Sequence, residues 1–291
     1  MKKILITGAN SYIGTSFENY IKENFSQEYE VDTVDMIDGS WREKDFSGYD
    51  VVFHVAGIAH SDNGKISKEK ELLYYAVNTD LAVETAKKAK AEGVNQFIFM
   101  SSAIVYGNSA PLGKNKMITI DTLVSPANCY GDSKVQAENG ILPLSDNCFK
   151  VVILRPPMIY GKDSKGNYQL LGKFAKRLPL FPYVKNQRSM LYIENLTEFV
   201  RLTINNEENG IFFPQNAEYS NTSEMVKMIG KVHGKNVRLL KGFTWALKVL
   251  ALFTGLVNKA FGNLTYDQDM SKYKQEYRKF SLAESVDVTE R

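Results

Sequence analysis

Short apolar runs alternate with helical stretches through the first half of this 291-residue chain. The runs are Ile4–Thr7, Glu30–Asp35, Asp50–Ala56, Asn95–Ser102 and Val151–Arg155. This alternation is typical of an α/β fold in which a doubly wound parallel sheet is covered by helices on both faces. Ligands of such sheets bind beyond the carboxyl ends of the strands, so functional residues are expected where the runs end. These positions are Gly8, Asp35, Ala56 and Ser102.

The longest helical stretch, Lys68–Ala91, is followed by Gly93, a residue type that often ends helices because it tolerates a left-handed backbone. Apolar residues recur along this stretch at the spacing of one helix face. They are Leu72, Ala76, Val83, Ala86 and Ala89. The pattern predicts one continuous helix packed against the sheet.

The second half of the chain has a weaker pattern. Asp163–Arg188 is polar and is not expected to contain a sheet strand. Asn221–Glu224 has the features of a helix N-terminus. The residues expected in the core behind it are Met225, Met228 and Ile229. The charged residues after Ser271 are expected to be loosely held.

The composition excludes several classes of protein. Lys and Arg exceed Asp and Glu by only three, which does not indicate a nucleic-acid surface. Cys129 and Cys148 do not make a disulfide framework, and a strand at the N-terminus does not resemble a signal peptide, so we expect a cytoplasmic protein. His54 and His60 lack the spacing of metal ligands and are expected to pack in the core or line a pocket.

The apolar segment Phe243–Leu256 could suggest a membrane helix. Its 14 residues are fewer than the roughly 20 that a span needs, and Lys248 lies near its centre. A core helix or a subunit contact is expected instead, and contact with a membrane surface stays open.

The loop Thr7–Gly14 joins the first strand to a helix. Gly8 and Gly14 stand where a dinucleotide-binding loop needs a tight turn and close packing of helix on strand. Ser11 replaces the middle glycine of that pattern, but a small side chain still fits there, and its hydroxyl could donate to a phosphate oxygen. The helix then opens with Tyr12 and Ile13, whose amides are expected to face the phosphates.

An acidic residue ends the next strand. Asp35 follows Gly14 by 21 residues, where a carboxylate is expected to accept hydrogen bonds from the adenine ribose. A carboxylate repels a 2′-phosphate, so the sequence favours NAD over NADP. Ala56, at the end of the third run, is also expected to line the cofactor. The alternative is that Gly8 and Gly14 are ordinary turn residues and Asp35 is a solvated acid.

Tyr130 and Lys134 are four residues apart, on one face of a helix, while Ser102 ends a buried strand. An ammonium about 4 Å from a phenol hydroxyl would lower the phenol pKa by about three units at an effective dielectric near 20. Tyr130 would then accept a proton from a substrate hydroxyl near neutral pH. The alternative is an ordinary surface pair.

In this order, the glycine loop, the Ser102 strand end and the Tyr130-x-x-x-Lys134 pair resemble the extended short-chain dehydrogenase/reductase superfamily. Within it, the match is to the NAD-dependent nucleotide-sugar epimerase/dehydratase family. The resemblance covers roughly Lys2–Leu196.

The resemblance implies how the chain is divided. We expect a Rossmann-type NAD-binding domain over residues 1–160. A smaller, partly interleaved substrate domain is expected over 161–291, with residues 189–206 returning to the first domain. A homodimer is also implied.

The resemblance also implies roles for single residues. Ser102 would hydrogen-bond the reacting oxygen, and Lys134 would bind the nicotinamide ribose. Asn78 would serve the cofactor domain, with an ordinary structural role as the alternative. Arg188 would bind the diphosphate of a nucleotide sugar, and Asn167 lies in the loop that caps it. UDP is the commonest carrier in the family.

The residues after Ser102 indicate which of the family's reactions to expect. Related dehydratases have adjacent acids there, whereas this chain has Ala103, Ile104 and Val105. We therefore expect hydride transfer at C4 of a UDP-hexose rather than loss of water. A 4-epimerase is preferred, since Asp35 suggests NAD that is recycled within each turnover, in a pathway that makes surface polysaccharide precursors.

Two alternatives stay open. Leu154–Gly161 and Arg188–Leu196 resemble bacterial NAD(P)H-dependent 4-keto-sugar reductases. A non-catalytic dinucleotide-binding regulator is the other alternative, but it would have no reason to keep Ser102, Tyr130 and Lys134 together.

Overall fold

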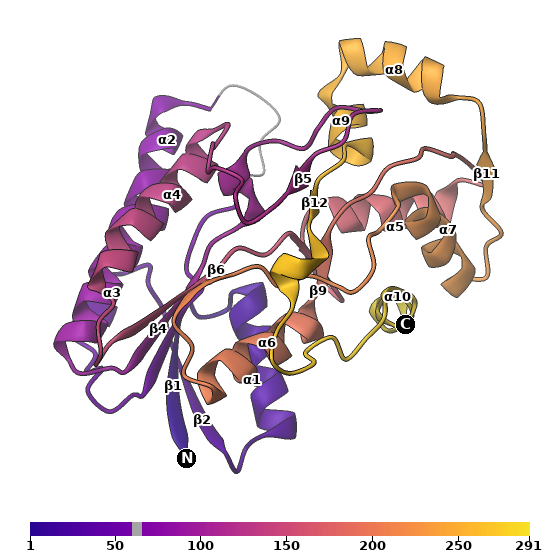
Figure 1. The fold of residues 1–291 in the computed structure, drawn as a ribbon. Helices are drawn as coiled ribbons and strands as arrows, with labels where there is room; N and C mark the ends of the chain where they lie inside the picture. The colour runs from indigo at the N-terminus through magenta and orange to yellow at the C-terminus, as the bar shows by residue number, and fades with distance from the viewer. Residues whose placement is uncertain (60–65) are drawn as a thin grey trace. The chain divides into compact units, whose positions relative to one another are not determined.

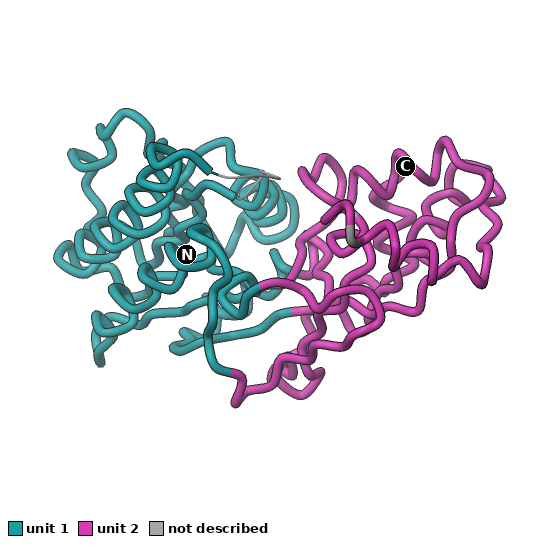
Figure 2. The backbone as a smooth tube through the Cα atoms, turned by 90° about the horizontal axis from the view of Figure 1, so that it is seen from above, with its two compact units in different colours: residues 1–107, 123–156, 196–214 teal, residues 108–122, 157–195, 215–291 magenta. Residues whose placement is uncertain are grey.

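A computed structural model describes residues 1–59 and 66–291. The chain forms two compact units (Figure 2). Unit 1 comprises residues 1–107, 123–156 and 196–214, and unit 2 comprises 108–122, 157–195 and 215–291. Residues 108–122, expected in the first domain, belong to unit 2, because β5 (Met117–Ile118) pairs with β12 (Thr265–Tyr266).

Unit 1 is built on a parallel sheet of six strands in the order β10-β6-β4-β3-β1-β2. The strands are β1 (Lys2–Thr7), β2 (Tyr29–Val34), β3 (Val51–His54), β4 (Gln96–Met100), β6 (Lys150–Leu154) and β10 (Gly210–Phe212). All five predicted runs form strands of this sheet, which confirms the predicted fold class. The chain order reverses between β1 and β3, and this switch point is where ligands of such sheets bind.

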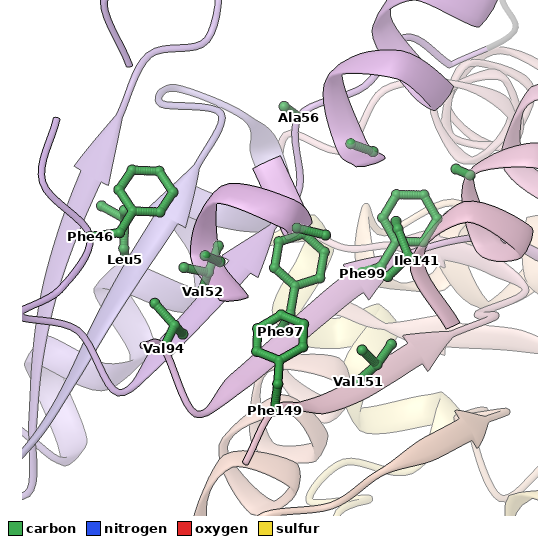
Figure 3. Close-up of a cluster of buried hydrophobic side chains, with 14 of the residues drawn as sticks. Leu5, Phe46, Val52, Ala56, Val94, Phe97, Phe99, Ile141, Phe149 and Val151 are labelled. Atoms are coloured by element: carbon green, nitrogen blue, oxygen red, sulfur yellow. The ribbon is translucent and has the colours of Figure 1, made fainter. Parts of the chain in front are cut away.

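Helices cover both faces of the sheet (Figure 1). One face carries α1 (Tyr12–Asn24) and α6 (Ile193–Asn205), and the other carries α3 (Leu81–Ala91) and α4 (Cys129–Ile141). Figure 3 shows the apolar cluster on the second face, where Phe97 and Phe99 of β4 lie beside Phe149 and Val151. Small residues on the covering helices allow close packing on these rings. They are Ala82, Ala86, Ala89 and Ala137.

The long helix predicted over Lys68–Ala91 is interrupted. A π-helical turn, Ala76–Asp80, separates α2 (Lys68–Tyr75) from α3. A π-turn adds one residue to the helix and rotates the faces on its two sides relative to one another. Leu72 is therefore 61% exposed, although Ala86 and Ala89 are buried as predicted.

Unit 2 contains three two-stranded sheets: β5 with β12, β7 (Met158–Tyr160) with β9 (Met190–Tyr192), and β8 (Leu180–Pro182) with β11 (Arg238–Leu240). Its helices are α5 (Asn167–Arg177), α7 (Thr222–Val232), α8 (Thr244–Phe253), α9 (Gly255–Phe261) and α10 (Leu282–Glu290). The prediction of no strand in Asp163–Arg188 is wrong, since Phe181 of β8 pairs with Leu239 of β11.

The predicted helix start at Asn221 is confirmed. The Asn221 side chain accepts hydrogen bonds from the Ser223 and Glu224 amides, at 2.9 and 3.1 Å. Met225 and Ile229 are fully buried as expected.

The residues after Ser271 are held by specific contacts, contrary to expectation. Tyr277 is buried, and its hydroxyl donates to the Gln215 carbonyl at 2.8 Å. The Tyr160 and Ser285 hydroxyls are hydrogen-bonded at 2.6 Å, which ties α10 to β7. In the part of the chain that is described, no helix is long and apolar enough to cross a membrane.

Candidate active site

The glycine loop lies at the switch point of the sheet. Gly8 has a φ of +104°, and a Cβ there would come within 2.8 Å of the Ala56 nitrogen, so only glycine fits without strain. The Gly8 and Ala9 amides both donate to the Val34 carbonyl, at 2.9 and 3.1 Å. These contacts hold the loop against the carboxyl ends of β2 and β3.

Ser11, in the place of the middle glycine, is the N-cap of α1. Its Oγ accepts a hydrogen bond from the Gly14 amide at 3.2 Å, which leaves the hydroxyl proton available for a ligand oxygen. The amides of Tyr12 and Ile13 lie in the first helical turn, where no intrahelical carbonyl is available to them. A helix N-terminus of this kind fits the pyrophosphate of a dinucleotide.

Gly14 is required by packing. A Cβ at this position would come within 2.6 Å of Ser11 Oγ and 3.0 Å of Ile6 Cγ2. We expect Gly14→Ala to weaken NAD binding and to lower the free energy of unfolding by about 1–3 kcal/mol, because it displaces the cap and crowds the strand. Fluorescence titration with NAD and urea unfolding measure the two effects. Gly48→Ala is the matched control, since a Cβ there meets nothing within 4 Å.

Asp35 directly follows β2 and is exposed. One of its carboxylate oxygens, Oδ1, accepts a hydrogen bond from the Ile37 amide at 2.9 Å. We interpret the other oxygen, Oδ2, as the acceptor of a hydrogen bond from a ribose hydroxyl of the cofactor. The glycine loop is bonded to the carbonyl of Val34, the residue directly before Asp35.

His54, at the end of β3, is fully buried. Its Nδ1 is hydrogen-bonded to Thr7 Oγ1 at 2.7 Å, and its ring stacks on Phe97 and Phe99. Burial, reinforced by the charge of Lys134, lowers the pKa of His54 to about 3. His54 is thus a packing residue, whereas His60 lies outside the described residues. Among residues 1–59 and 66–291, no cluster could hold a metal ion.

The buried imidazole makes stability sensitive to acid. An unfolded histidine titrates at a pKa of about 6.5, so below that pH the unfolded chain binds a proton that the folded chain excludes. The free energy of unfolding therefore does not depend on His54 protonation well above pH 6.5. It falls as the pH drops from about 6.5 toward 3. Urea unfolding at pH 6.5 and 5.0 should show wild type losing about 2 kcal/mol more than His54→Gln. Equal losses in the two proteins would contradict this assignment.

Tyr130 and Ser102 are brought together at the end of β4. The hydrogen bond with Ser102 favours the ionised phenol, but burial outweighs it and raises the pKa of Tyr130. The ring packs against Tyr74, with centroids 6.0 Å apart. The expected lowering of the Tyr130 pKa by Lys134 is therefore not found in the protein alone.

The Lys134 ammonium is engaged with the backbone instead. Its Nζ donates to the Met100 carbonyl at 2.9 Å and lies 4.6 Å from the centre of the Phe99 ring. Burial lowers the pKa of Lys134 to about 8, opposed by the charge of Glu138. A Cβ at Gly57 would come within 3.3 Å of Nζ, so the ammonium also lies beside the segment that follows β3.

Asn78 lies in the π-turn, and its side chain joins two parts of the site. Its Oδ1 accepts from the Ile58 amide at 2.8 Å, while its Nδ2 donates to the Ile58 carbonyl and to Ser133 Oγ, both at 3.1 Å. Ser133 lies next to Lys134 on α4. Asn78 therefore connects the segment after β3 to the helix that bears Tyr130.

Sequence reasoning missed a buried ion pair behind these groups. Arg155 donates to Glu138 through Nε at 3.1 Å and through a terminal nitrogen at 2.5 Å, and it also donates to Tyr106 at 2.7 Å. Ser101 donates to the same carboxylate. Glu138 follows Lys134 by one helical turn. This spacing could have indicated that Glu138 lies in the site close to Lys134, but it gives no sign of the partner Arg155.

Two predicted substrate residues belong to unit 2. Arg188 donates to the carbonyls of Lys259 at 2.7 Å and Ala260 at 3.4 Å, and burial lowers its pKa. Among the described residues no carboxylate pairs with its guanidinium, so the group retains capacity for an anion. Asn167 is the first residue of α5 rather than a loop residue, and it follows Gly166, which has a φ of +104°.

Comparison with known proteins identifies the class. The model of the NAD-dependent epimerase/dehydratase family matches residues 4–212, and the chain belongs to this family. It is 30% identical to a UDP-glucose 4-epimerase of Vibrio cholerae over 297 aligned positions, covering 93% of this chain and 89% of that protein.

Solved structures share the fold. A UDP-glucuronic acid 4-epimerase from Bacillus cereus, in complex with NAD, has a TM-score of 0.72 at 19% identity, covering 98% of this chain and 96% of the other. A dTDP-4-dehydrorhamnose reductase from Clostridium acetobutylicum has a TM-score of 0.64 at 20% identity, covering 82% and 83%. The family and the fold therefore make this an NAD-dependent enzyme of the epimerase/dehydratase family with a Rossmann-type sheet.

Proposed function

We propose that the protein is an NAD-dependent 4-epimerase of a UDP-hexose or UDP-N-acetylhexosamine. The observation that carries the proposal is the placement of Tyr130, Ser102 and Lys134 together at the carboxyl end of β4, where Lys134 donates to the Met100 carbonyl. The similarity to a UDP-glucose 4-epimerase over most of both chains supports it.

The glycine loop and Asp35 would hold NAD, with Lys134 at its nicotinamide ribose. NAD supplies the hydride acceptor and donor when bound. Tyr130 would take the proton of the C4 hydroxyl, and Ser102 would hydrogen-bond the same oxygen. Since burial raises the Tyr130 pKa, the positive charges of Lys134 and of the nicotinamide ring have to offset that burial before the phenol can act as a base.

The surroundings of Ser102 support epimerisation over loss of water. Ala103–Tyr106 forms a short 3₁₀ helix, and its first three residues have no acidic side chain that could protonate a leaving hydroxyl. Arg188 would bind the diphosphate, because its guanidinium donates only to two carbonyls and, among the residues that the structure describes, pairs with no carboxylate. Asn167, at the first turn of α5, would add a neutral polar contact.

Proton NMR tests the proposal. Protein is incubated with UDP-glucose or UDP-N-acetylglucosamine and catalytic NAD, without a reductant. We expect anomeric signals of the C4 epimer to appear and to reach an equilibrium ratio from either direction. A protein that binds NAD but converts neither sugar would contradict the 4-epimerase proposal.

A 4-keto-sugar reductase is the second candidate. Leu154–Gly161 and Arg188–Leu196, which resemble such reductases, form β7, β9 and the start of α6. This candidate predicts stoichiometric oxidation of reduced cofactor with a UDP-4-keto-6-deoxyhexose. A non-catalytic regulator would show neither conversion nor oxidation.

A further inference from the structure

Helix α8 exposes a ridge of large apolar side chains. Trp245, Val249 and Phe253 follow one another at a spacing of four residues, and they are 71%, 50% and 82% exposed. Residues at this spacing lie on one helix face. Single exposed apolar residues are ordinary, but a contiguous apolar ridge indicates a surface that meets an apolar partner.

The side of α8 next to this ridge borders an apolar hollow of about 250 Å³. It is lined by apolar residues of β8, β11 and α8, among them Phe181, Leu240 and Leu247. Leu180 and Leu250 at its rim are 48% and 49% exposed. Figure 1 shows α8 at the top of the view, above β11. The apolar surface of this unit therefore extends from the ridge onto the neighbouring strands.

Charge is distributed very unevenly around this surface. Segments 164–193 and 225–266, which include β8, β11 and α8, have 13 of the chain's 36 Lys and Arg and none of its 33 Asp and Glu. Both segments belong to unit 2. Exposed cations precede α8 in the chain, lie on it and follow it. They are Lys235, Arg238, Lys241, Lys248 and Lys259.

We propose that α8 and the cationic segments around it dock unit 2 on the surface of an anionic lipid bilayer, with Trp245 and Phe253 inserted at the level of the headgroups. Short helices with an apolar face and basic flanks bind membranes in this way, and tryptophan favours the interface. The long stem of Lys248 allows its ammonium to reach the headgroups while the helix is inserted.

The charge pattern favours a lipid surface over a second copy of the chain. Two copies joined through this face would bring together two surfaces whose segments 164–193 and 225–266 have cations and no carboxylates of their own, and like charges at an interface oppose association. An anionic bilayer matches both the charge and the apolar ridge. The proposal does not depend on the 4-epimerase activity.

Vesicle binding followed by tryptophan fluorescence tests the docking. The chain has two tryptophans, and Trp41 is fully buried, so a change in emission on binding reports on Trp245. The full-length protein is mixed with vesicles of phosphatidylcholine, alone or in equal parts with phosphatidylglycerol. We expect at least about tenfold tighter binding to the anionic vesicles, a blue shift of the emission and weakening by salt.

Variants distinguish vesicle binding through the apolar ridge from binding by electrostatic attraction alone. The double variant Trp245→Ser, Phe253→Ser should lower binding about tenfold or more, as measured by vesicle flotation. Ile120→Ser is the matched control, because Ile120 is also 71% exposed but lies outside both segments. Equal binding to neutral vesicles, absence of binding, or unchanged binding of the double variant would each overturn the proposal. Self-association of the wild type that the double variant abolishes, without vesicle binding, would assign the face to a dimer instead.

Discussion

The Tyr130→Phe variant is expected to lower kcat by about 10²–10⁴-fold, the usual contribution of a positioned general acid–base group. The substitution removes only the phenol hydroxyl, and it keeps the ring that packs against Tyr74. NAD binding should change little, because the glycine loop and Asp35 are untouched. Initial rates of epimerisation and a fluorescence titration with NAD measure the two properties on the same preparation.

Tyr75→Phe provides the control. Tyr75 lies next to Tyr74 on α2, and its hydroxyl donates to Asp132 on α4 at 2.9 Å, so its loss also removes one hydrogen bond to the catalytic helix. Its activity should remain close to that of wild type. If Tyr130→Phe kept more than a tenth of the activity, or if both variants lost it equally, Tyr130 would not be the proton acceptor.

Glu138→Gln is expected to give the largest loss of stability. Glu138 is 2% exposed and Arg155 8% exposed, so Glu138→Gln removes the negative charge that pairs with a buried guanidinium. Breaking a buried pair in this way costs about 3–5 kcal/mol. Chemical denaturation at pH 7 measures the change. Activity should fall as well, since Ser101 donates to Glu138 and Lys134 precedes it by one helical turn on α4.

A second bidentate pair in the same unit provides a control for Glu138. Arg42 donates to both oxygens of Glu84, at 2.5 and 2.6 Å, but both side chains are about half exposed. Solvent screens this pair, so Glu84→Gln should have a far smaller effect. Similar losses for the two variants would show that burial of the Glu138–Arg155 pair does not matter for stability.

The sheet and the cofactor loop could be predicted from the sequence because their signals are local. An apolar run has to be buried wherever it lies, and Gly8 and Gly14 are needed where backbone or strand comes too close for a Cβ. The replacement of the middle glycine by Ser11 did not mislead the prediction, because a small N-cap residue fits that position. The helical spacing of Tyr130 and Lys134 likewise holds for any helix.

Other features depend on contacts between distant residues. The π-turn rotates Leu72 out of the core, and no periodicity of the sequence marks the extra residue. β8 exists because it pairs with β11, about 60 residues later. The residues after Ser271 are held by partners such as Tyr160, which a charged composition does not reveal. The Tyr130 pKa could not be predicted from a tyrosine–lysine distance alone, because burial dominates it.

The most direct test of the 4-epimerase proposal follows a deuterium label at C4. UDP-glucose and UDP-N-acetylglucosamine, each deuterated at C4, are incubated with the protein and catalytic NAD, and the products are analysed by NMR and mass spectrometry. The proposal predicts the C4 epimer with the deuterium still at C4, since the same carbon loses and regains it within one turnover. No epimer from either sugar, together with stoichiometric reduction of a 4-keto sugar by reduced cofactor, would contradict it and identify a reductase.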